Sequence, residues 1–296
     1  MLVVLGFCHK DRDSALELVK WIAELGPYPG HKLMLSYTQR AGDGYRELQD
    51  VASGVFDEVI LHRCYDEDER GWPQSCNHLW QRTVYTIAQT VKEPWLWLEP
   101  DSVPTGKGWL NAVSSKYKEA QDAGKAFMGC DVNVSWCDRH MSGIAVYPGD
   151  VGQYTSQLWA LNNIAWDMFF KDDFLKSAYF TDLIQHVWWS DPEIQKQPTF
   201  SVRKDLELLD PNAVIFHRNK DLTLIPWLRE RLLIMSQDRA EKAESIQDAP
   251  QSSDELPPRD QITRAVERLV MLCQKRKGFE NHARAELKRL GLTYRK

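Results

Sequence analysis

Apolar segments of strand length alternate with amphipathic segments of helical period along the first third of the chain. Alternation of this kind predicts a mostly parallel sheet, because each helix returns the chain to the edge where the next parallel strand starts. The helices then cover both faces of the sheet, which makes this an α/β protein. We expect strands over 2–7, 31–37, 56–62 and 95–98 and helices over 12–26, 45–53 and 77–91.

Two acidic residues follow the last of these strands. The apolar run "WLWL" leads directly into Glu99-Pro100-Asp101. Ligands of such sheets bind beyond the carboxyl ends of the strands, and residues i and i+2 of an extended chain point to the same side. Carboxylate oxygens there suit Mg²⁺ or Mn²⁺, which often also contact substrate phosphates. The alternative is a solvated loop after a buried strand.

Several classes of protein are disfavoured by what the sequence lacks. It contains neither GxGxxG nor GxxxxGK[ST], which argues against a nicotinamide-binding Rossmann domain and a P-loop. No apolar run approaches the roughly 20 residues that cross a bilayer, and no signal peptide is recognisable at the start. The cysteines form no CxxC pair, as is typical of reduced thiols. We therefore expect a cytoplasmic protein without a membrane partner.

Charge divides the chain into three parts. The net charge is about −8 over residues 1–236, about −4 over 237–258 and about +7 over 259–296. The middle part is rich in Ser, Pro, Gln and acids and has little to bury, so we expect a flexible acidic linker. The last part has apolar residues at helical spacing on both sides of a glycine, which predicts a small basic helical segment.

Two neighbouring motifs carry a family resemblance. "GWPQSCNHLWQRTVYTI" (71–87) places a glycine and an asparagine in a loop and helix, and "PWLWLEPDSVP" (94–104) follows it. This order resembles the donor-binding half of nucleotide-sugar glycosyltransferases of the GT-A fold, in which a G...N pattern precedes a DxD strand. Glu99 stands where the first Asp of DxD is usual. The resemblance implies that 1–236 is a catalytic domain with this Rossmann-like fold.

The resemblance also implies roles for individual residues. Asp101 would be a ligand of Mn²⁺ or Mg²⁺, and Glu99 would bind either the metal or the ribose of a nucleotide-sugar donor. Gly71, Trp72 and Asn77 would contact the same donor. Trp72 is in addition able to stack on the base.

Two later segments extend the resemblance. "HMSGIAVYP" (140–148) is similar to the strand that lines the sugar and acceptor cleft, with His140, Ser142 and Gly143 facing the substrate. The alternative is a plain strand with a glycine bulge. "NAVIFHRNKDLTLIPWL" (212–228) is similar to members that supply a third metal ligand from a C-terminal histidine.

That histidine is His217, and neutral imidazole suits Mn²⁺. Lys220, three residues later, would meet a diphosphate oxygen. The alternative for His217 is a polar cap at the end of a strand.

The acceptor side requires a carboxylate if the reaction inverts the anomeric centre, because the acceptor hydroxyl has to lose its proton. Asp167 is the candidate base, since the family often carries an acid at this place. Asp150 and Asp182 compete with it, although each also suits a helix N-cap or the surface. In a retaining reaction Asp167 would only hold hydroxyls of the donor sugar, and the sequence leaves this choice open.

The acceptor itself is indicated only by the tail. A basic helical segment suits contact with nucleic-acid phosphates, and the last third of the catalytic domain resembles phage-encoded enzymes that glucosylate hydroxymethylated pyrimidines in DNA. Such an enzyme would use UDP-glucose in the host cytoplasm. A solvated tail, a cell-surface glycan, lipid or protein acceptor, and a non-catalytic binding module are the alternatives. The candidate phosphate contacts are Arg264, Arg268, Lys275, Arg276, Lys277, Arg284, Lys288, Arg289, Arg295 and Lys296.

Overall fold

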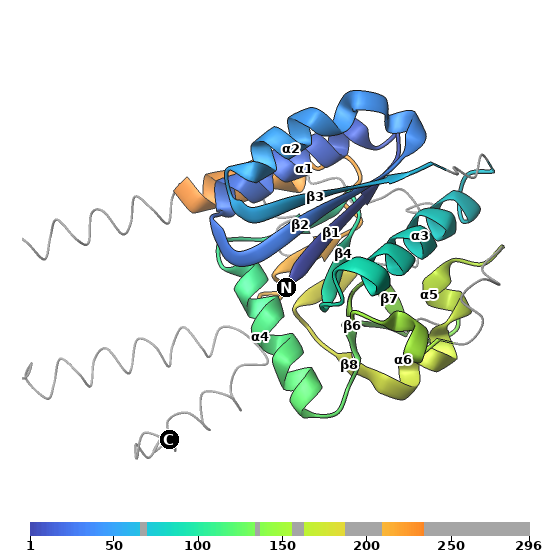
Figure 1. Ribbon diagram of the computed structural model, residues 1–296. Coiled ribbons are helices and arrows are strands. Elements are labelled where there is room, and N and C mark those ends of the chain that lie inside the picture. The colour runs from blue at the N-terminus through green and yellow to red at the C-terminus, as the bar shows by residue number, and fades with distance from the viewer. Residues whose placement is uncertain (66–69, 134–136, 156–162, 187–208, 234–296) are drawn as a thin grey trace, which may run out of the picture. The chain divides into compact units, whose positions relative to one another are not determined.

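The computed structural model describes residues 1–65, 70–133, 137–155, 163–186 and 209–233 (Figure 1). Within these ranges, no helix has the length and apolar character needed to cross a membrane. The cysteines in the described ranges form no disulfide with one another. The predicted linker at 237–258 and basic segment at 259–296 lie outside the described residues, so both remain predictions.

The elements predicted for the first third of the chain are present in the expected order. They are β1 (Leu2–Phe7), α1 (Arg12–Leu25), β2 (Tyr28–Thr38), α2 (Tyr45–Ser53), β3 (Phe56–Cys64), α3 (Gln74–Thr90) and β4 (Trp95–Leu98), with the short 3-10 helix η1 (Gln39–Gly44) before α2. The predicted bounds differ most at β2, which begins at Tyr28 rather than residue 31, and at α3, which begins at Gln74 rather than residue 77.

The later elements are shorter. They are β5 (Ser102–Pro104), α4 (Trp109–Asp122), β6 (Phe127–Val132), β7 (His140–Tyr147), η2 (Val151–Gln153), α5 (Trp166–Phe169), α6 (Lys171–Ser177), β8 (Ala178–Phe180), β9 (Ile184–His186), β10 (Ile215–His217) and a helix over 224–233. Of these, the sequence predicted the strands near 140–148 and 212–217.

A seven-stranded sheet forms the centre of the fold. Its strand order is β3-β2-β1-β4-β7-β6-β8. The pairs β3/β2, β2/β1, β1/β4 and β6/β8 are parallel, whereas β7 runs antiparallel to both β4 and β6. The prediction of a mostly parallel α/β sheet is confirmed.

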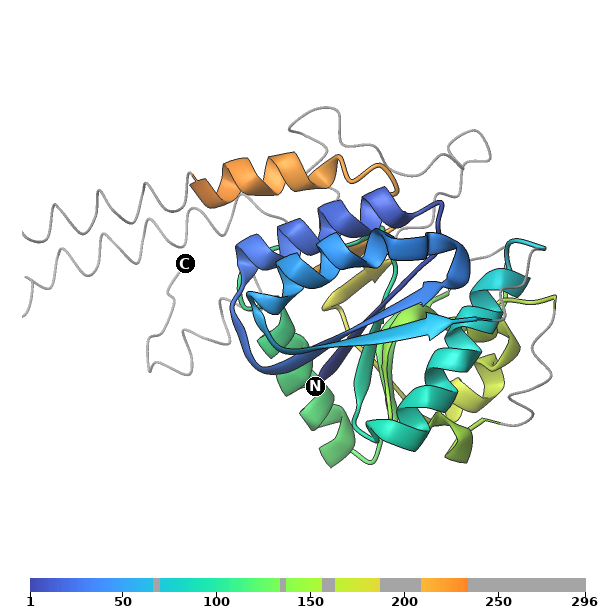
Figure 2. The same cartoon turned by 45° about the horizontal axis from the view of Figure 1, so that its top comes forward.

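Helices cover both faces of this sheet, also as predicted (Figures 1 and 2). α1 and α2 lie side by side on one face, where Arg229 of the 224–233 helix forms an ion pair with Glu24 of α1 at 2.6 Å. α3, α5 and α6 lie on the other face. There, Trp80 of α3 stacks on Trp166 of α5 with their ring centroids 5.5 Å apart.

A second sheet of three very short strands adjoins the end of β4. Its order is β5-β10-β9, with β10 antiparallel to β5 and parallel to β9. In this register His217 lies opposite Ser102 on one side and His186 on the other. The sequence predicted the strand that ends at His217 but not this sheet, because its partners β5 and β9 have only three residues each, too few to show a strand period.

Gly6, in β1, allows the indole ring of a tryptophan in β4 to lie close to the backbone. A Cβ atom at Gly6 would stand 2.4 Å from the indole ring of Trp97, which is only 2% exposed. Trp97 in turn packs edge-on against Trp95 and Trp166. The absence of a side chain at Gly6 therefore sets where the indole lies beneath the cavity described below.

We expect Gly6→Ala to lower the free energy of unfolding by about 1–3 kcal/mol, because the added methyl group overpacks a closed layer. Urea denaturation followed by tryptophan fluorescence measures this. Gly106→Ala is the matched control, since a Cβ there meets nothing within 4 Å. Equal stability of the two variants would contradict the close packing of Gly6 and Trp97.

Candidate active site

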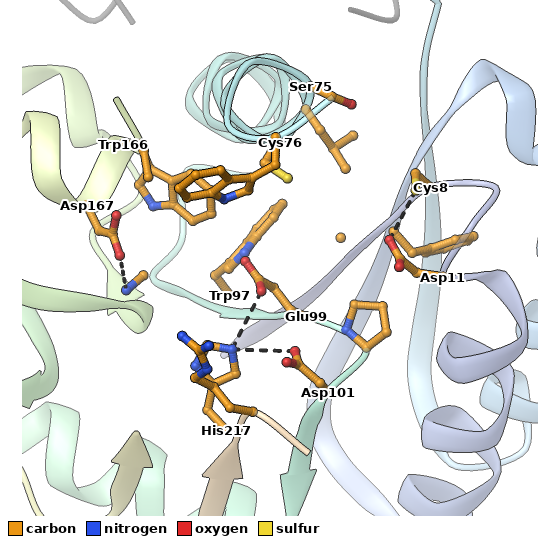
Figure 3. A pocket seen from close by; sticks show the side chains of 18 of the residues that line it. Cys8, Asp11, Ser75, Cys76, Trp97, Glu99, Asp101, Trp166, Asp167 and His217 are labelled. Carbon is orange, nitrogen blue, oxygen red and sulfur yellow. Dashed lines mark hydrogen bonds and ion pairs between the residues drawn. The ribbon is translucent and has the colours of Figure 1, made fainter. Parts of the chain in front are cut away.

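A cavity of about 710 Å³ lies at the carboxyl edge of the parallel strands (Figure 3). Its lining comes from the ends of β1, β4, β9 and β10, the first turns of α1 and α3, and residues 163–168. This is the edge at which the sequence predicted a ligand site. A volume of this size is typical of pockets for small organic ligands.

The two acids after β4 occupy a tight turn between the two sheets. The Ser102 N–H donates to the Glu99 carbonyl oxygen at 2.9 Å, and the Glu99 N–H donates to Ser102 Oγ at 3.1 Å. These two hydrogen bonds close the Glu99-Pro100-Asp101 turn on itself. Both carboxylates therefore lie next to each other at the end of β4.

His217 completes a cluster with these acids. Its Nε2 lies 3.5 Å from Glu99 Oε2 and 3.4 Å from Asp101 Oδ1. One ligand atom from each of the three residues lies within 4.8 Å of the others. The dashed lines in Figure 3 show how the imidazole is aimed between the two carboxylates. The three predicted metal ligands are thus brought together.

The backbone after β10 fixes this arrangement. The N–H groups of Arg218 and Asn219 lie 3.2 and 3.3 Å from the Asp101 carbonyl oxygen and donate to it. Arg218 adopts a φ of 84°, a left-handed conformation that costs a non-glycine residue about 1–3 kcal/mol. Strained backbone of this kind persists only where surrounding contacts hold it, and it is common at functional sites.

The charged side chains of the cluster shift one another's pKa values. Burial alone would raise the pKa of Asp101, which is 2% exposed, but the positive charges of His217 and Lys220 hold it well below its usual range. Burial alone would lower the pKa of His217. The negative charges of Asp101 and Glu99 outweigh the effect of burial and raise the pKa of His217 to about 9. Lys220 Nζ lies 3.1 Å from Asp101 Oδ2. A buried carboxylate is therefore balanced by two cations.

The donor set of the cluster fits a divalent metal ion. Both carboxylate oxygens of Asp101 are buried, and neither accepts a hydrogen bond of good geometry although His217 and Lys220 are close. Buried carboxylate oxygens without a well-aligned donor are unusual, because their desolvation is costly. Two carboxylates and an imidazole are ligands that Mn²⁺ accepts. Glu99, Asp101 and His217 would hold the ion.

Asp167 faces the same cavity from α5. Its Oδ2 accepts a hydrogen bond from the Gly143 N–H at 3.1 Å, and its Oδ1 accepts one from the Met168 N–H at 2.9 Å. The Nε2 atom of buried His140 lies 3.9 Å from Oδ2. Burial raises the pKa of Asp167 above its usual value, more than these contacts lower it. A carboxylate of raised pKa that still reaches the cavity is suited to accept a proton.

The structure brings most predicted site residues to the cavity. Its lining includes Trp72, Glu99, Asp101, His140, Gly143, Asp167, His217 and Lys220. Trp72 is 76% exposed at the rim. The functional roles assigned to these residues remain predictions.

Five predicted residues lie outside the lining formed by the described residues. Asp150 is exposed and accepts a hydrogen bond from Gln153. Gly71, with a φ of 85°, begins the turn before α3, and buried Ser142 bonds to His186. The competing acid Asp182 is bonded to Asn212 at the surface.

The fifth such residue, Asn77, shapes the cavity wall. Its Nδ2 donates to the Ile164 carbonyl oxygen at 2.7 Å, and its Oδ1 accepts from the Trp166 N–H at 3.0 Å. Both ends of the amide are therefore engaged by the segment that leads into α5. Asn77 positions this segment, and its predicted contact with a donor remains a prediction.

Sequence reasoning missed several polar groups of the cavity, among them His186 and Asp11. His186 lies at the end of β9, where no strand was predicted, and Asp11 accepts a hydrogen bond from the Cys8 thiol beside β1 at 3.1 Å. No local pattern marks either residue. Both are brought to the cavity by strand pairing and by the turn from β1 into α1.

No known family model and no curated protein matches this chain. Solved structures with a similar chain trace include the galactosyltransferase LgtC in complex with donor and acceptor sugar analogues, at 8% identity and a TM-score of 0.48, covering 78% of this chain and 94% of that one. Another is mouse xyloside xylosyltransferase 1, at 8% identity and a TM-score of 0.45, covering 73% and 96%.

A third is the glycosyltransferase GlyE of Streptococcus pneumoniae, at 9% identity and a TM-score of 0.41, covering 73% and 54%. Similarity at such low sequence identity and TM-score describes only the course of the chain. The functional assignment therefore rests on the geometry of the cavity.

We expect Asp101→Asn to weaken Mn²⁺ binding at least about tenfold, because the change removes the charge of the most buried ligand. Isothermal titration calorimetry measures the affinity, and a thermal melt confirms that the variant is folded. Asp122→Asn is the control, since that carboxylate is 68% exposed on α4 and pairs only with Lys118 among the residues described. Unchanged affinity of Asp101→Asn would remove the metal assignment.

Proposed function

We propose that this protein is a metal-dependent glycosyltransferase that moves a sugar from a nucleotide-diphosphate sugar to a hydroxyl group. The observation that carries the proposal is the convergence of Glu99, Asp101 and His217 within 4.8 Å at the edge of a cavity of about 710 Å³. Asp167 faces the same cavity, so a metal-ligand set and a candidate base share one chamber. The resemblance of the 71–104 region to the GT-A donor half agrees with this assignment.

The donor end of the proposed site is the acid and histidine cluster. A divalent metal bound there would neutralise the charge that develops on the leaving diphosphate. Lys220 Nζ already lies 3.1 Å from Asp101 and would contact a diphosphate oxygen from the same side. Trp72, exposed at the rim, offers a flat face to the base.

The acceptor end of the proposed site is Asp167. In an inverting transfer the acceptor oxygen bonds to the anomeric carbon, the bond from that carbon to the diphosphate oxygen breaks, and the acceptor proton passes to Asp167. The Gly143 and Met168 N–H groups hold the carboxylate in place. In a retaining transfer Asp167 binds donor hydroxyls instead. The anomeric configuration of the product, determined by NMR, distinguishes these two roles.

We expect Mn²⁺-dependent hydrolysis of one donor in a panel of nucleotide sugars, with UDP-glucose the first to test. Asp101→Ala should lower the rate at least about a hundredfold, since the leaving diphosphate loses its counter-charge. Release of the nucleoside diphosphate measures the rate, and Asp122→Ala again serves as the control. A wild-type protein that binds Mn²⁺ but neither binds nor cleaves any donor would favour the non-catalytic binding module.

For the acceptor we propose hydroxymethylated pyrimidine bases in DNA, which would place the enzyme in the cytoplasm where phage DNA is made. The support is the net charge of about +7 over residues 259–296. Lys and Arg neutralise phosphates regardless of base sequence, and the catalytic cavity would then supply the selectivity for the hydroxymethyl group. A surface glycan, lipid or protein acceptor is the alternative.

Deleting residues 237–296 should weaken DNA binding about tenfold or more at low salt, and the difference should shrink as salt rises. Fluorescence anisotropy with labelled duplexes measures this, while donor hydrolysis by the truncated protein reports an intact cavity. DNA affinity that does not change on truncation would contradict the role of the tail. Transfer to glycan but not to hydroxymethylated DNA would overturn the proposed acceptor.

A further inference from the structure

His186 lies directly beside the proposed metal ligand His217. The parallel pairing of β9 and β10 places the two residues in register, and their Nδ1 atoms are 3.0 Å apart. Their rings meet edge to face, with centroids 4.6 Å apart and an interplanar angle of 85°. The Nε2 atom of His217 points the opposite way, toward Glu99 and Asp101.

Two nitrogen atoms at this distance need one proton between them. Either His217 Nδ1–H donates to the lone pair of His186 Nδ1, or His186 Nδ1–H donates to His217. In the second case neutral His217 carries its proton on Nε2, where it faces the carboxylates and leaves no lone pair for a metal ion. Only the first arrangement makes His217 a ligand through Nε2.

Ser142 of β7 also contacts His186. Its Oγ lies 2.9 Å from the same His186 Nδ1 atom, and the Ile144 N–H points to this oxygen at 3.4 Å. Because Oγ can either donate or accept, this contact holds the His186 ring in place with either tautomer. In the first arrangement, the lone pair of His186 Nδ1 faces His217 Nδ1–H, and His186 carries its own proton on Nε2.

We infer that His186 is a positioning residue that holds His217 in the Nδ1–H tautomer and so directs its Nε2 lone pair at the metal site. This inference rests on the metal site of the proposed function. A hydrogen bond to the second nitrogen of a ligating histidine fixes the tautomer and the ring orientation, and losing one typically costs about 10–100-fold in metal affinity.

The test compares three substitutions at one position. Asn places its Oδ1 close to the position of His186 Nδ1, Gln carries its amide one methylene further out, and Leu fills the volume without an acceptor. We expect His186→Leu and His186→Gln to weaken Mn²⁺ binding about 10–100-fold and His186→Asn to stay within about threefold of wild type. Calorimetry measures the affinities, thermal melts confirm folding, and His9→Leu, an exposed histidine outside the cavity lining, is the control.

A spectroscopic measurement separates positioning from packing. Histidine ¹⁵N NMR of the Mg²⁺-saturated wild type should show His217 protonated on Nδ1, and this proton should remain in His186→Asn. Wild-type affinity in His186→Leu, equal losses in the Asn and Leu variants, or a His217 protonated on Nε2 in the Mg²⁺ complex would each overturn the inference. A wild-type protein that binds neither ion would instead overturn the proposed metal site, so the two failures are distinguishable.

Discussion

The buried carboxylate of Asp101 is the constraint on which the site depends. Taking a carboxylate out of water costs several kcal/mol unless other charges compensate, and removing one partner of such a pair typically costs about 3–5 kcal/mol. The compensating charges, His217 and Lys220, come from a segment more than a hundred residues later in the chain. Pairing of β10 with β5 holds that segment in place, so the small sheet and the site form one unit.

The two ends of the cavity differ in how their charge is set. At the end proposed to bind the metal, the positive charges of His217 and Lys220 keep Asp101 ionised despite its burial. At the other end, burial prevails over the contacts with His140, Met168 and Gly143, so that the pKa of Asp167 is raised. Two carboxylates in one chamber with pKa values displaced in opposite directions are suited to separate tasks. This division arises from their neighbours, since the two side chains are chemically the same.

Much of the fold, but only part of the site, was predictable from the sequence. Strands such as β1 and β4 carry at least four consecutive apolar residues, and long amphipathic helices separate them, so periodicity predicts them. Family resemblance then led to Asp101 and His217. β5 and β9 have only three residues each, too few for any period, and pairing across the fold determines them. His186 was missed for that reason, and the structural use of Asn77 was missed because its partners lie 87 and 89 residues away.

Strands of three residues do not hold a ligand cluster by themselves, so the rigidity of the site has to come from its surroundings. The Trp21 Nε1–H of α1 donates to the Pro104 carbonyl oxygen at 2.8 Å. Thr105 bonds through its backbone N–H to Val214 and through its hydroxyl to Ala213. Since Pro104 ends β5, the strand that follows the acidic turn, and Thr105 comes next, these bonds connect the region of Asp101 to α1 and to the approach to β10. The geometry of the proposed metal ligands is therefore supported by α1, an element that supplies none of them.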